Sequence, residues 1–396
     1  MHHTAITSIE NPGSVALTAK WRTALIACVV IGVLAFAGGL AADPARAWHN
    51  YLVGYFLFLC WGLFGVFFAA LNHAVNATWV IVVRRVAEGM SWFLPVAFVL
   101  FLFMLPGLKH IFPWAAGEQF ADPTKQRWLS LPYFAARHIL FFFLWIFFAW
   151  KIVGLSLKQD ATGDVLLSKK MIRWSIAFMP IFAGTFSLAA FDLMMSLQPE
   201  WSSTIFGVYC FAGLFQSGLA LLTILFIILK RQGALANVAT PSHLKDLGTL
   251  LFAFTIFMTY IGFSQFMLIW YANLPEETVF FASRMQGGWE YLFLSLVVFK
   301  FVIPFFGLLS QAAKKNEKWL LAICVVVLIG QYLDIYWLTM PTVRESFVPF
   351  SWMEIGTLLG FIGLFGLAVS GFFAKHPVLA ARDPRVLQSV NWRFWE

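Results

Sequence analysis

Ten separate runs of roughly twenty apolar residues fill the sequence, and each is long enough to cross the hydrocarbon core of a bilayer as a helix. Of the 396 residues, 61% are hydrophobic and only 12% are charged, which leaves almost no water-soluble part. The sequence therefore predicts an all-α integral membrane protein. The expected spans are 22–41, 51–72, 91–106, 138–156, 174–196, 206–229, 247–271, 290–310, 319–340 and 352–374.

The basic residues between the spans predict the orientation of the chain. An even number of spans places both termini on one side, where the connections carry eighteen Lys and Arg residues against seven on the other side. Cytoplasmic loops are the ones enriched in Lys and Arg. We therefore expect a cytoplasmic segment at 1–21, a ten-helix membrane domain at 22–374 and a cytoplasmic tail at 375–396, in a bacterial inner (plasma) membrane. This bias also accounts for the net charge of +8 without nucleic-acid binding.

Two spans end with the same spacing between an acid and a proline. Asp192 precedes Pro199 by seven residues, and Asp334 precedes Pro341 by the same number. The span before each of these two contains a lysine within its apolar run, Lys151 in one case and Lys300 in the other. The repeat predicts two four-helix bundles, spans two to five and six to nine, flanked by the first and tenth helices.

Ionisable and polar side chains inside the spans are the candidate functional residues, because a charge at the bilayer centre costs about 2.5–3.5 kcal/mol. The proton-pathway candidates are Asp192, Asp334, Lys300, Tyr260, Gln265, Lys151 and His73. The candidates for a quinol site in the outer half are His138, Arg137, Asp192 and Glu354. A static role stays open for all of them, as ion pairs that tie helices together or as side chains that reach the interface.

Motifs for bound redox cofactors are missing from the sequence. The histidines in and near the spans lie at span ends or in connections, whereas a membrane haem needs axial ligands that face each other. The four cysteines show no CxxC or cluster spacing. We therefore expect no haem, no metal ion and no catalytic residue in this chain.

Two long stretches carry a resemblance to a known family. FDLMMSLQPEWSSTIFGVYCFAG at 191–213 and DLGTLLFAFTIFMTYIGFSQFMLIWYANLPEET at 246–278 are similar to the F subunit (ActF-like) of bacterial alternative complex III. That complex is a quinol:electron-acceptor oxidoreductase of the respiratory chain. The ten spans and the two four-helix units also resemble the wider NrfD/PsrC-like family of membrane subunits that interact with quinones.

The resemblance implies a subunit of an electron-transport complex. In such a complex, iron–sulfur and multihaem cytochrome c subunits on the outer side take electrons from quinol, with menaquinol as one candidate species. A sister NrfD-like membrane subunit holds the main quinol site. The F subunit lies beside it, in contact with lipid and quinone, and contributes a proton pathway.

Three functions therefore remain open on the sequence. The first is a subunit that anchors the redox subunits of a quinol:cytochrome c-type oxidoreductase and conducts protons. The second is a chain that itself binds and oxidises quinol, with Asp192 and His138 as proton acceptors. The third is a stand-alone secondary transporter, in which helices break at corresponding positions of both halves. It ranks last, because Pro180 and Pro304 interrupt the fifth and eighth spans, which do not correspond.

The predicted orientation is tested by reporters fused after Glu396. Because positive-inside bias places this end in the cytoplasm, a fluorescent reporter is expected to fluoresce there and a periplasmic phosphatase to stay inactive. Phosphatase activity from the same fusion, measured in whole cells, would reverse the orientation and every assignment of an inner and an outer side.

Overall fold

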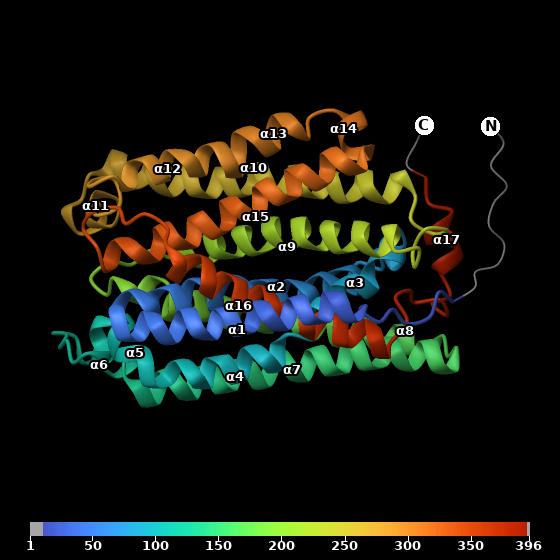
Figure 1. The fold of residues 1–396 in the computed structure, drawn as a ribbon, viewed down its shortest axis with the longest axis horizontal. Coiled ribbons are helices and arrows are strands. Elements are labelled where there is room, and N and C mark those ends of the chain that lie inside the picture. The colour runs from blue at the N-terminus through green and yellow to red at the C-terminus, as the bar shows by residue number, and fades with distance from the viewer. Residues whose placement is uncertain (1–10, 394–396) are drawn as a thin grey trace.

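The structure of the chain is a computed structural model that describes residues 11–393. Over these residues the chain forms helices and no strands, and ten helical segments are long and apolar enough to cross a membrane. The predicted all-α membrane fold is confirmed. The segments lie side by side along one common direction (Figure 1).

Ten helical segments cross the bundle, and the third and the eighth of them each contain an irregular turn. They are α1 (Ala19–Ala42), α2 (Pro44–Ala74), α3 (Ile81–Ser91) followed by α4 (Leu94–Met104), α7 (Leu131–Thr162), α8 (Leu166–Leu193), α9 (Phe206–Arg231), α10 (Pro241–Ala272), α12 (Trp289–Val297) followed by the π-helical turn η4 (Val298–Val302) and α13 (Ile303–Gly307), α15 (Glu317–Thr339) and α16 (Trp352–Lys375). Short helices in or beside the connections are α5 (Leu108–Ile111), α6 (Pro123–Trp128), α11 (Pro275–Ala282), α14 (Gln311–Lys315) and α17 (Val386–Val390). Single 3-10 turns are η1 (Leu105–Gly107), η2 (Pro113–Ala115), η3 (Met195–Leu197) and η5 (Met340–Thr342).

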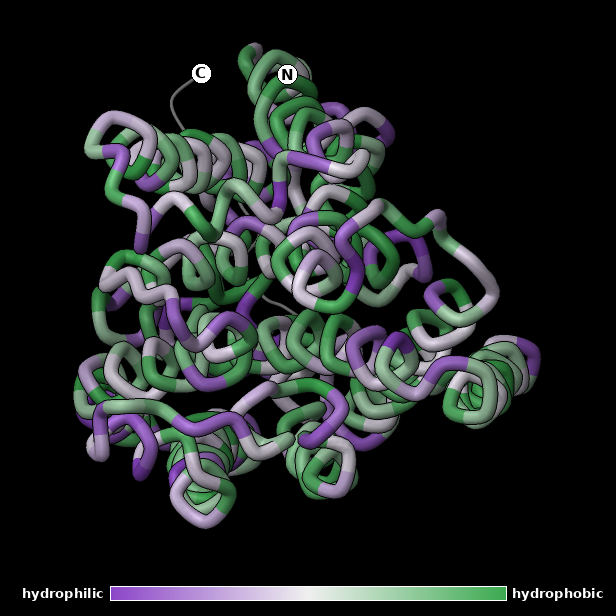
Figure 2. Tube along the Cα trace, turned by 90° about the vertical axis from the view of Figure 1, so that its left-hand side faces the viewer, coloured by the Kyte–Doolittle hydropathy of each residue, from purple (hydrophilic) through white to green (hydrophobic). Residues whose placement is uncertain are grey.

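The two described ends of the chain lie on the same face of the bundle. The backbone N–H of Val378 donates to the carbonyl of Gly13 at 3.1 Å, and Val15 donates to the carbonyl of Phe373 at 2.8 Å. We call this the terminal face, and the opposite one, which carries α6 and α11, the loop face (Figure 1). In the end-on view of Figure 2 the crossing helices are mainly hydrophobic, and hydrophilic segments occur in the connections.

Helix α2 lies at the centre of the bundle. Its apolar stretch is entirely buried, as expected for a helix that is hydrophobic all round. It contacts α3, α7 and α8 of the first predicted four-helix unit, and α9 and α15 of the second. Within the second unit α9 packs on α10 and α15, and α15 packs on α12.

The third span is longer than the sequence predicts. The apolar run predicts a span at 91–106, but the helical segment extends over Ile81–Ile111. Its first turns contain Arg84, Arg85 and Glu88, all of them buried. Hydropathy assigns such residues to a loop, because it scores each charge as if it faced lipid. Helix α7 likewise begins seven residues before the predicted 138–156 span, so Arg137 lies inside the helix.

Helices α1 and α16 approach each other through small residues. A Cβ placed on Gly360 of α16 would lie 2.9 Å from the Cα of Gly32 of α1, and one on Gly356 would lie 2.3 Å from the Cβ of Ala35. Small residues four apart let two backbones approach closely in a membrane, where dispersion contacts replace the hydrophobic effect. This contact holds α1, which is otherwise largely exposed, against the rest of the bundle.

A leucine at position 360 tests this contact. Gly360→Leu is expected to destabilise the protein by about 1–3 kcal/mol, because the added side chain must separate the two helices. The matched control is Gly371→Leu on the same helix, where an added Cβ meets nothing within 4 Å. Thermal unfolding of the protein in detergent is expected to show a lower Tm for the first variant only. Equal Tm values for the two variants would contradict the close contact.

Candidate functional site

Lys300 lies in the π-helical turn η4, halfway along the eighth span. Pro304, four residues later, has no N–H with which to close the helical hydrogen bond to the Lys300 carbonyl. Ile303 instead donates to the carbonyl of Val298, five residues back, and this widens the turn. The freed Lys300 carbonyl accepts a hydrogen bond from Nε2 of Gln216 at 3.0 Å. Proline thus causes the π turn, and the turn ties α9 to the eighth span beside Lys300.

The side chain of Lys300 forms a buried ion pair with Asp334 of α15. Lys300 Nζ donates to Oδ2 of Asp334 at 2.5 Å and to Oε1 of Gln331 at 2.9 Å. The hydroxyl of Tyr209 on α9 donates to Oδ1 of Asp334 at 2.5 Å. Gly330 leaves room for the lysine, since a Cβ there would lie 2.9 Å from Lys300 Cγ. We call Tyr209, Lys300, Gln331 and Asp334 the Asp334 cluster.

A cavity of about 310 Å³ adjoins the Asp334 cluster. It lies among α9, α10, α11, the eighth span and α15, and most of its lining is aromatic or aliphatic. Its polar lining residues are Tyr209, Thr259, Gln265, Lys300 and Asp334. The cavity therefore combines an apolar wall with a few hydrogen-bonding groups, as small-molecule sites do.

A buried arginine stands behind the wall of this cavity, in the connection between α11 and α12. The guanidinium carbon of Arg284 lies 3.8 Å from the centre of the Phe280 ring, and Nη2 donates to the carbonyl of Leu338 at 2.9 Å. Nη1 donates to Oε1 of Gln198 at 2.8 Å. Within residues 11–393 no carboxylate pairs with it. Burial lowers the pKa of Arg284 to about 9. Because this value is still above 7, the side chain stays protonated at neutral pH.

The second aspartate, Asp192 of α8, pairs with Arg137 of α7. Arg137 Nε donates to Oδ2 at 3.0 Å and Nη2 to Oδ1 at 2.9 Å, which is the strong two-bond geometry. Trp128 Nε1 also donates to Oδ1 at 3.1 Å. His138 Nδ1 lies 3.9 Å from Oδ2 of Asp192, but it donates to the Phe134 carbonyl at 2.9 Å. We call Trp128, Arg137, His138 and Asp192 the Asp192 cluster.

The Asp192 cluster lies near the loop face. A cavity of about 400 Å³ there is lined by Asp192, Trp128 and the residues that follow η3. His138 is buried, and its Nε2 has no hydrogen-bond partner among the described residues. Three of the four predicted quinol-site residues are thus brought together. The fourth, Glu354, is buried elsewhere and accepts hydrogen bonds from Arg46 Nε and Asn50 Nδ2, each at 2.8 Å.

The remaining proton-pathway candidates do not join either cluster directly. Gln265 is buried and lines the cavity beside the Asp334 cluster. Tyr260, on another face of α10, is 64% exposed and lies outside the bundle interior. Lys151 is half-buried, with its Nζ 4.4 Å from the centre of the Trp150 ring. His73 is buried toward the terminal face, and its Nε2 is unpartnered within the part of the chain that is described.

The sequence did not reveal a third group of buried charges, on the terminal face. Oε2 of Glu88 accepts from Arg85 Nη1 at 2.6 Å, and Oε1 accepts from the Ser156 hydroxyl at 2.9 Å. Arg85 also pairs with Asp160 of α7. Arg84 Nη1 donates to Oδ2 of Asp383 at 3.0 Å. We call this group the tail network, defined by the residues Arg84, Arg85, Glu88, Asp160 and Asp383.

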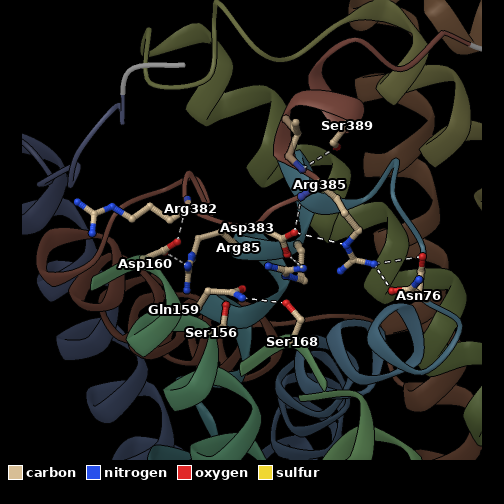
Figure 3. Close-up of polar contacts among 12 residues, drawn as sticks. Asn76, Arg85, Ser156, Gln159, Asp160, Ser168, Arg382, Asp383, Arg385 and Ser389 are labelled. Atoms are coloured by element: carbon tan, nitrogen blue, oxygen red, sulfur yellow. Dashed lines mark hydrogen bonds and ion pairs between the residues drawn. The ribbon is translucent and has the colours of Figure 1, made fainter. Parts of the chain in front are cut away.

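The tail network fastens the segment after α16 to the bundle. Figure 3 shows Asp383 and Arg385 of this segment above α3, with Arg385 reaching Asn76. The Ser389 hydroxyl donates to the carbonyl of Trp79 at 2.8 Å, and His243 Nε2 lies 3.0 Å from the Ser389 carbonyl oxygen. Hydropathy places Arg84 and Arg85 in a connection between two spans. A signal was present, since Glu88 follows them at helical spacing.

The fold and these clusters define a multi-pass α-helical membrane protein with ion pairs buried between its helices. A scan against models of known protein families finds none that matches this chain, and a search of curated proteins finds no match either. Among residues 11–393, no three His, Cys, Asp or Glu side chains come together as they would to hold a metal ion.

The contact between Asp383 and Arg84 gives a pH-dependent stability. Burial by itself raises the pKa of Asp383, but the charges of Arg84 and Arg385 outweigh it and hold the pKa below its ordinary value. The pair therefore stabilises the fold fully above the ordinary carboxyl pKa of about 4, and this is lost as pH falls through the lower folded-state pKa.

Asp383→Asn is expected to lower the free energy of unfolding at pH 7 by about 1–3 kcal/mol, because it leaves part of the buried Arg84 guanidinium without its charged partner. Thermal unfolding in detergent is expected to show the wild type and the variant converging as the pH falls below about 4. The control is Glu118→Gln, an exposed carboxylate on the loop face. A difference between Asp383→Asn and wild type that does not depend on pH would contradict the assignment.

Proposed function

We propose that this chain is a membrane subunit of a quinol:cytochrome c-type oxidoreductase in a bacterial inner membrane. In this role it anchors outer-side iron–sulfur and multihaem cytochrome c subunits, pairs with a sister NrfD-like subunit, and conducts protons through its own spans. Its termini lie in the cytoplasm, so the loop face is the outer one. The haem and iron–sulfur groups belong to the partners, and the chain itself contributes binding surface and proton transfer.

The observation that carries the proposal is the Asp334 cluster. A carboxylate, an amine and a phenol are joined there by short hydrogen bonds, where a fixed charge is expensive. Each of these groups both holds and releases protons, so a proton entering at one can leave at another. Ionisable groups inside membrane spans are rare and mark substrate or ion pathways, proton relays or counter-ions.

The positions of the other clusters support a proton route. The Asp192 cluster lies toward the loop face beside a cavity, and the tail network lies at the terminal face. His138 in the Asp192 cluster and His73 toward the terminal face each present a buried ring nitrogen without a hydrogen-bond partner among the described residues. Titratable groups thus occur near both faces and at the Asp334 cluster, as a route across the membrane requires.

The transporter alternative has less support. In a transporter with repeated halves, helices break at corresponding positions of both repeats. The eighth span is widened at η4, whereas its counterpart, α7, is a continuous helix over Leu131–Thr162. The π turn therefore belongs to one unit alone.

Asparagine substitutions in the assembled complex test the proton route. Asp192→Asn and Asp334→Asn keep the size of the side chain and remove the titratable group. In at least one of them, quinol-driven turnover or proton release in sealed vesicles is expected to fall by roughly 10²-fold, the usual effect of losing a proton-transferring group. The matched control is Tyr260→Phe, which removes a hydroxyl on the exposed face of α10.

Assembly is measured alongside activity, because Asp334→Asn leaves Lys300 without its buried counter-charge. Native mass spectrometry of the complex reports the attached subunits. If Asp334→Asn disrupts assembly, the double variant Lys300→Met with Asp334→Asn removes both charges and restores a neutral interior. Normal proton and electron fluxes in both assembled aspartate variants would mean that these residues are structural.

A further inference from the structure

We propose that the cavity beside the Asp334 cluster is a quinol-binding site of this chain, separate from the Asp192 cluster. The inference rests on the proposed function in one respect, namely that quinol is the substrate of the complex. It is carried by the shape of the cavity, by its polar groups and by the side on which it opens.

The size and wall of the cavity suit a flat ring. Its volume of about 310 Å³ falls within the range of roughly 300–1,000 Å³ found for small-molecule sites. The wall includes six aromatic side chains from five different elements, namely Phe206, Phe266, Phe280, Phe281, Phe293 and Trp337. Aromatic rings favour offset-stacked or edge-to-face contact with another ring. A lipid acyl chain has no ring and cannot make these ring–ring contacts.

The polar groups at the cavity wall can hydrogen-bond both the carbonyl oxygens of a quinone and the hydroxyl groups of a quinol. Lys300 donates two of its three N–H groups within the cluster, which leaves one donor for a quinone carbonyl, and Asp334 supplies an acceptor for a quinol hydroxyl. Gln265 is a separate and informative residue. Its side chain is 6% exposed and lines the cavity, yet its amide makes no hydrogen bond to another described residue. The amide is open to this largely apolar cavity, and a ligand oxygen there would give it a hydrogen-bond partner.

A positive charge stands behind the same wall. Arg284 stacks on Phe280 and donates to the carbonyl of Leu338, and both of these residues line the cavity. Because no carboxylate within the described chain neutralises it, its field favours negative charge on a ligand in the cavity. Quinols acquire such charge when a hydroxyl loses its proton, whereas the acyl chains of lipids do not.

The cavity opens toward the hydrocarbon layer. Phe263 of α10 and Val297 of α12 line it and are also exposed on the outside of the bundle, at 60% and 45% respectively. A lipid-soluble ligand can therefore enter between α10 and the eighth span and leave its isoprenoid tail in the bilayer. The polar groups lie at the inner end of this path, where the ring would stop.

Binding to the purified full-length chain tests the site without any turnover. The probe is a short-chain menaquinone, titrated into the protein in nanodiscs and followed by quenching of tryptophan fluorescence, to which Trp337 contributes. Gln265→Leu removes the unpartnered amide, and Gly262→Leu fills the cavity, since Gly262 lines it and faces Tyr209. Each variant is expected to weaken the apparent affinity about tenfold or more.

Two further variants make the result specific. Gly154→Leu on α7, where an added Cβ meets nothing within 4 Å, is expected to bind as the wild type does. Asp192→Asn is also expected to bind normally, because its cluster does not line this cavity. Thermal unfolding shows whether Gly262→Leu is folded. If it is not, the affinity of Gln265→Leu alone decides the test.

Several outcomes overturn the site. One is wild-type affinity in both Gln265→Leu and Gly262→Leu. Another is a loss of binding in Asp192→Asn alone, which would place the quinone site at the Asp192 cluster. Absence of menaquinone binding, with a phospholipid retained in the cavity on native mass spectrometry, assigns the cavity to lipid. These results are independent of the flux measurements above. Quinone binding with unaltered fluxes in the aspartate variants would remove the proton route and leave the site.

Discussion

Charge pairs buried between helices are the constraint on which the arrangement of this bundle depends. Moving an ion into a medium of low dielectric constant costs several kcal/mol, and only close partners repay this cost. Lys300 therefore fixes the eighth span against α15, as Arg137 fixes α7 against α8. Arg84 does the same for the tail after α16. Apolar packing alone would permit many rotations of these helices in lipid, whereas each pair permits few.

One proline in the eighth span changes the backbone beside the Asp334 cluster. Pro304 has no backbone N–H, and the turn η4 widens to a π turn. The carbonyl of Lys300 then accepts a hydrogen bond from Gln216 of α9. The Lys300 side chain meets Asp334 on α15, the helix that follows in the chain and runs antiparallel to the eighth span. Three spans thus converge on one position. The cavity lies beside this convergence, where straight helices would otherwise pack.

The sequence predicted the fold better than it predicted the contacts. Ten spans follow from hydropathy, and Asp192 and Asp334 stand out because charge inside a span is costly. Hydropathy could not recover Arg84 and Arg85, since their partners lie in α7 and in the tail, far along the chain. It also could not place Tyr260, because a tyrosine is equally acceptable on a lipid-facing surface and in an interior. Which face a residue occupies depends on neighbours that only the assembled bundle supplies.

The acid that recurs in the two four-helix units meets a different base in each. Asp334 pairs with Lys300 from the middle of the preceding span, but Asp192 pairs with Arg137 from near the start of α7. Lys151, the expected counterpart, lies nearer the terminal face and makes no ion pair within residues 11–393. The pair in the first unit lies near the loop face, beside a cavity, and Asp192 accepts two hydrogen bonds from the Arg137 guanidinium. The pair in the second unit lies deeper and beside an apolar cavity, where Asp334 contacts an amine and a phenol. Under the proposed function, the same carboxylate would exchange protons with solvent in one unit and meet a lipid-soluble ligand in the other.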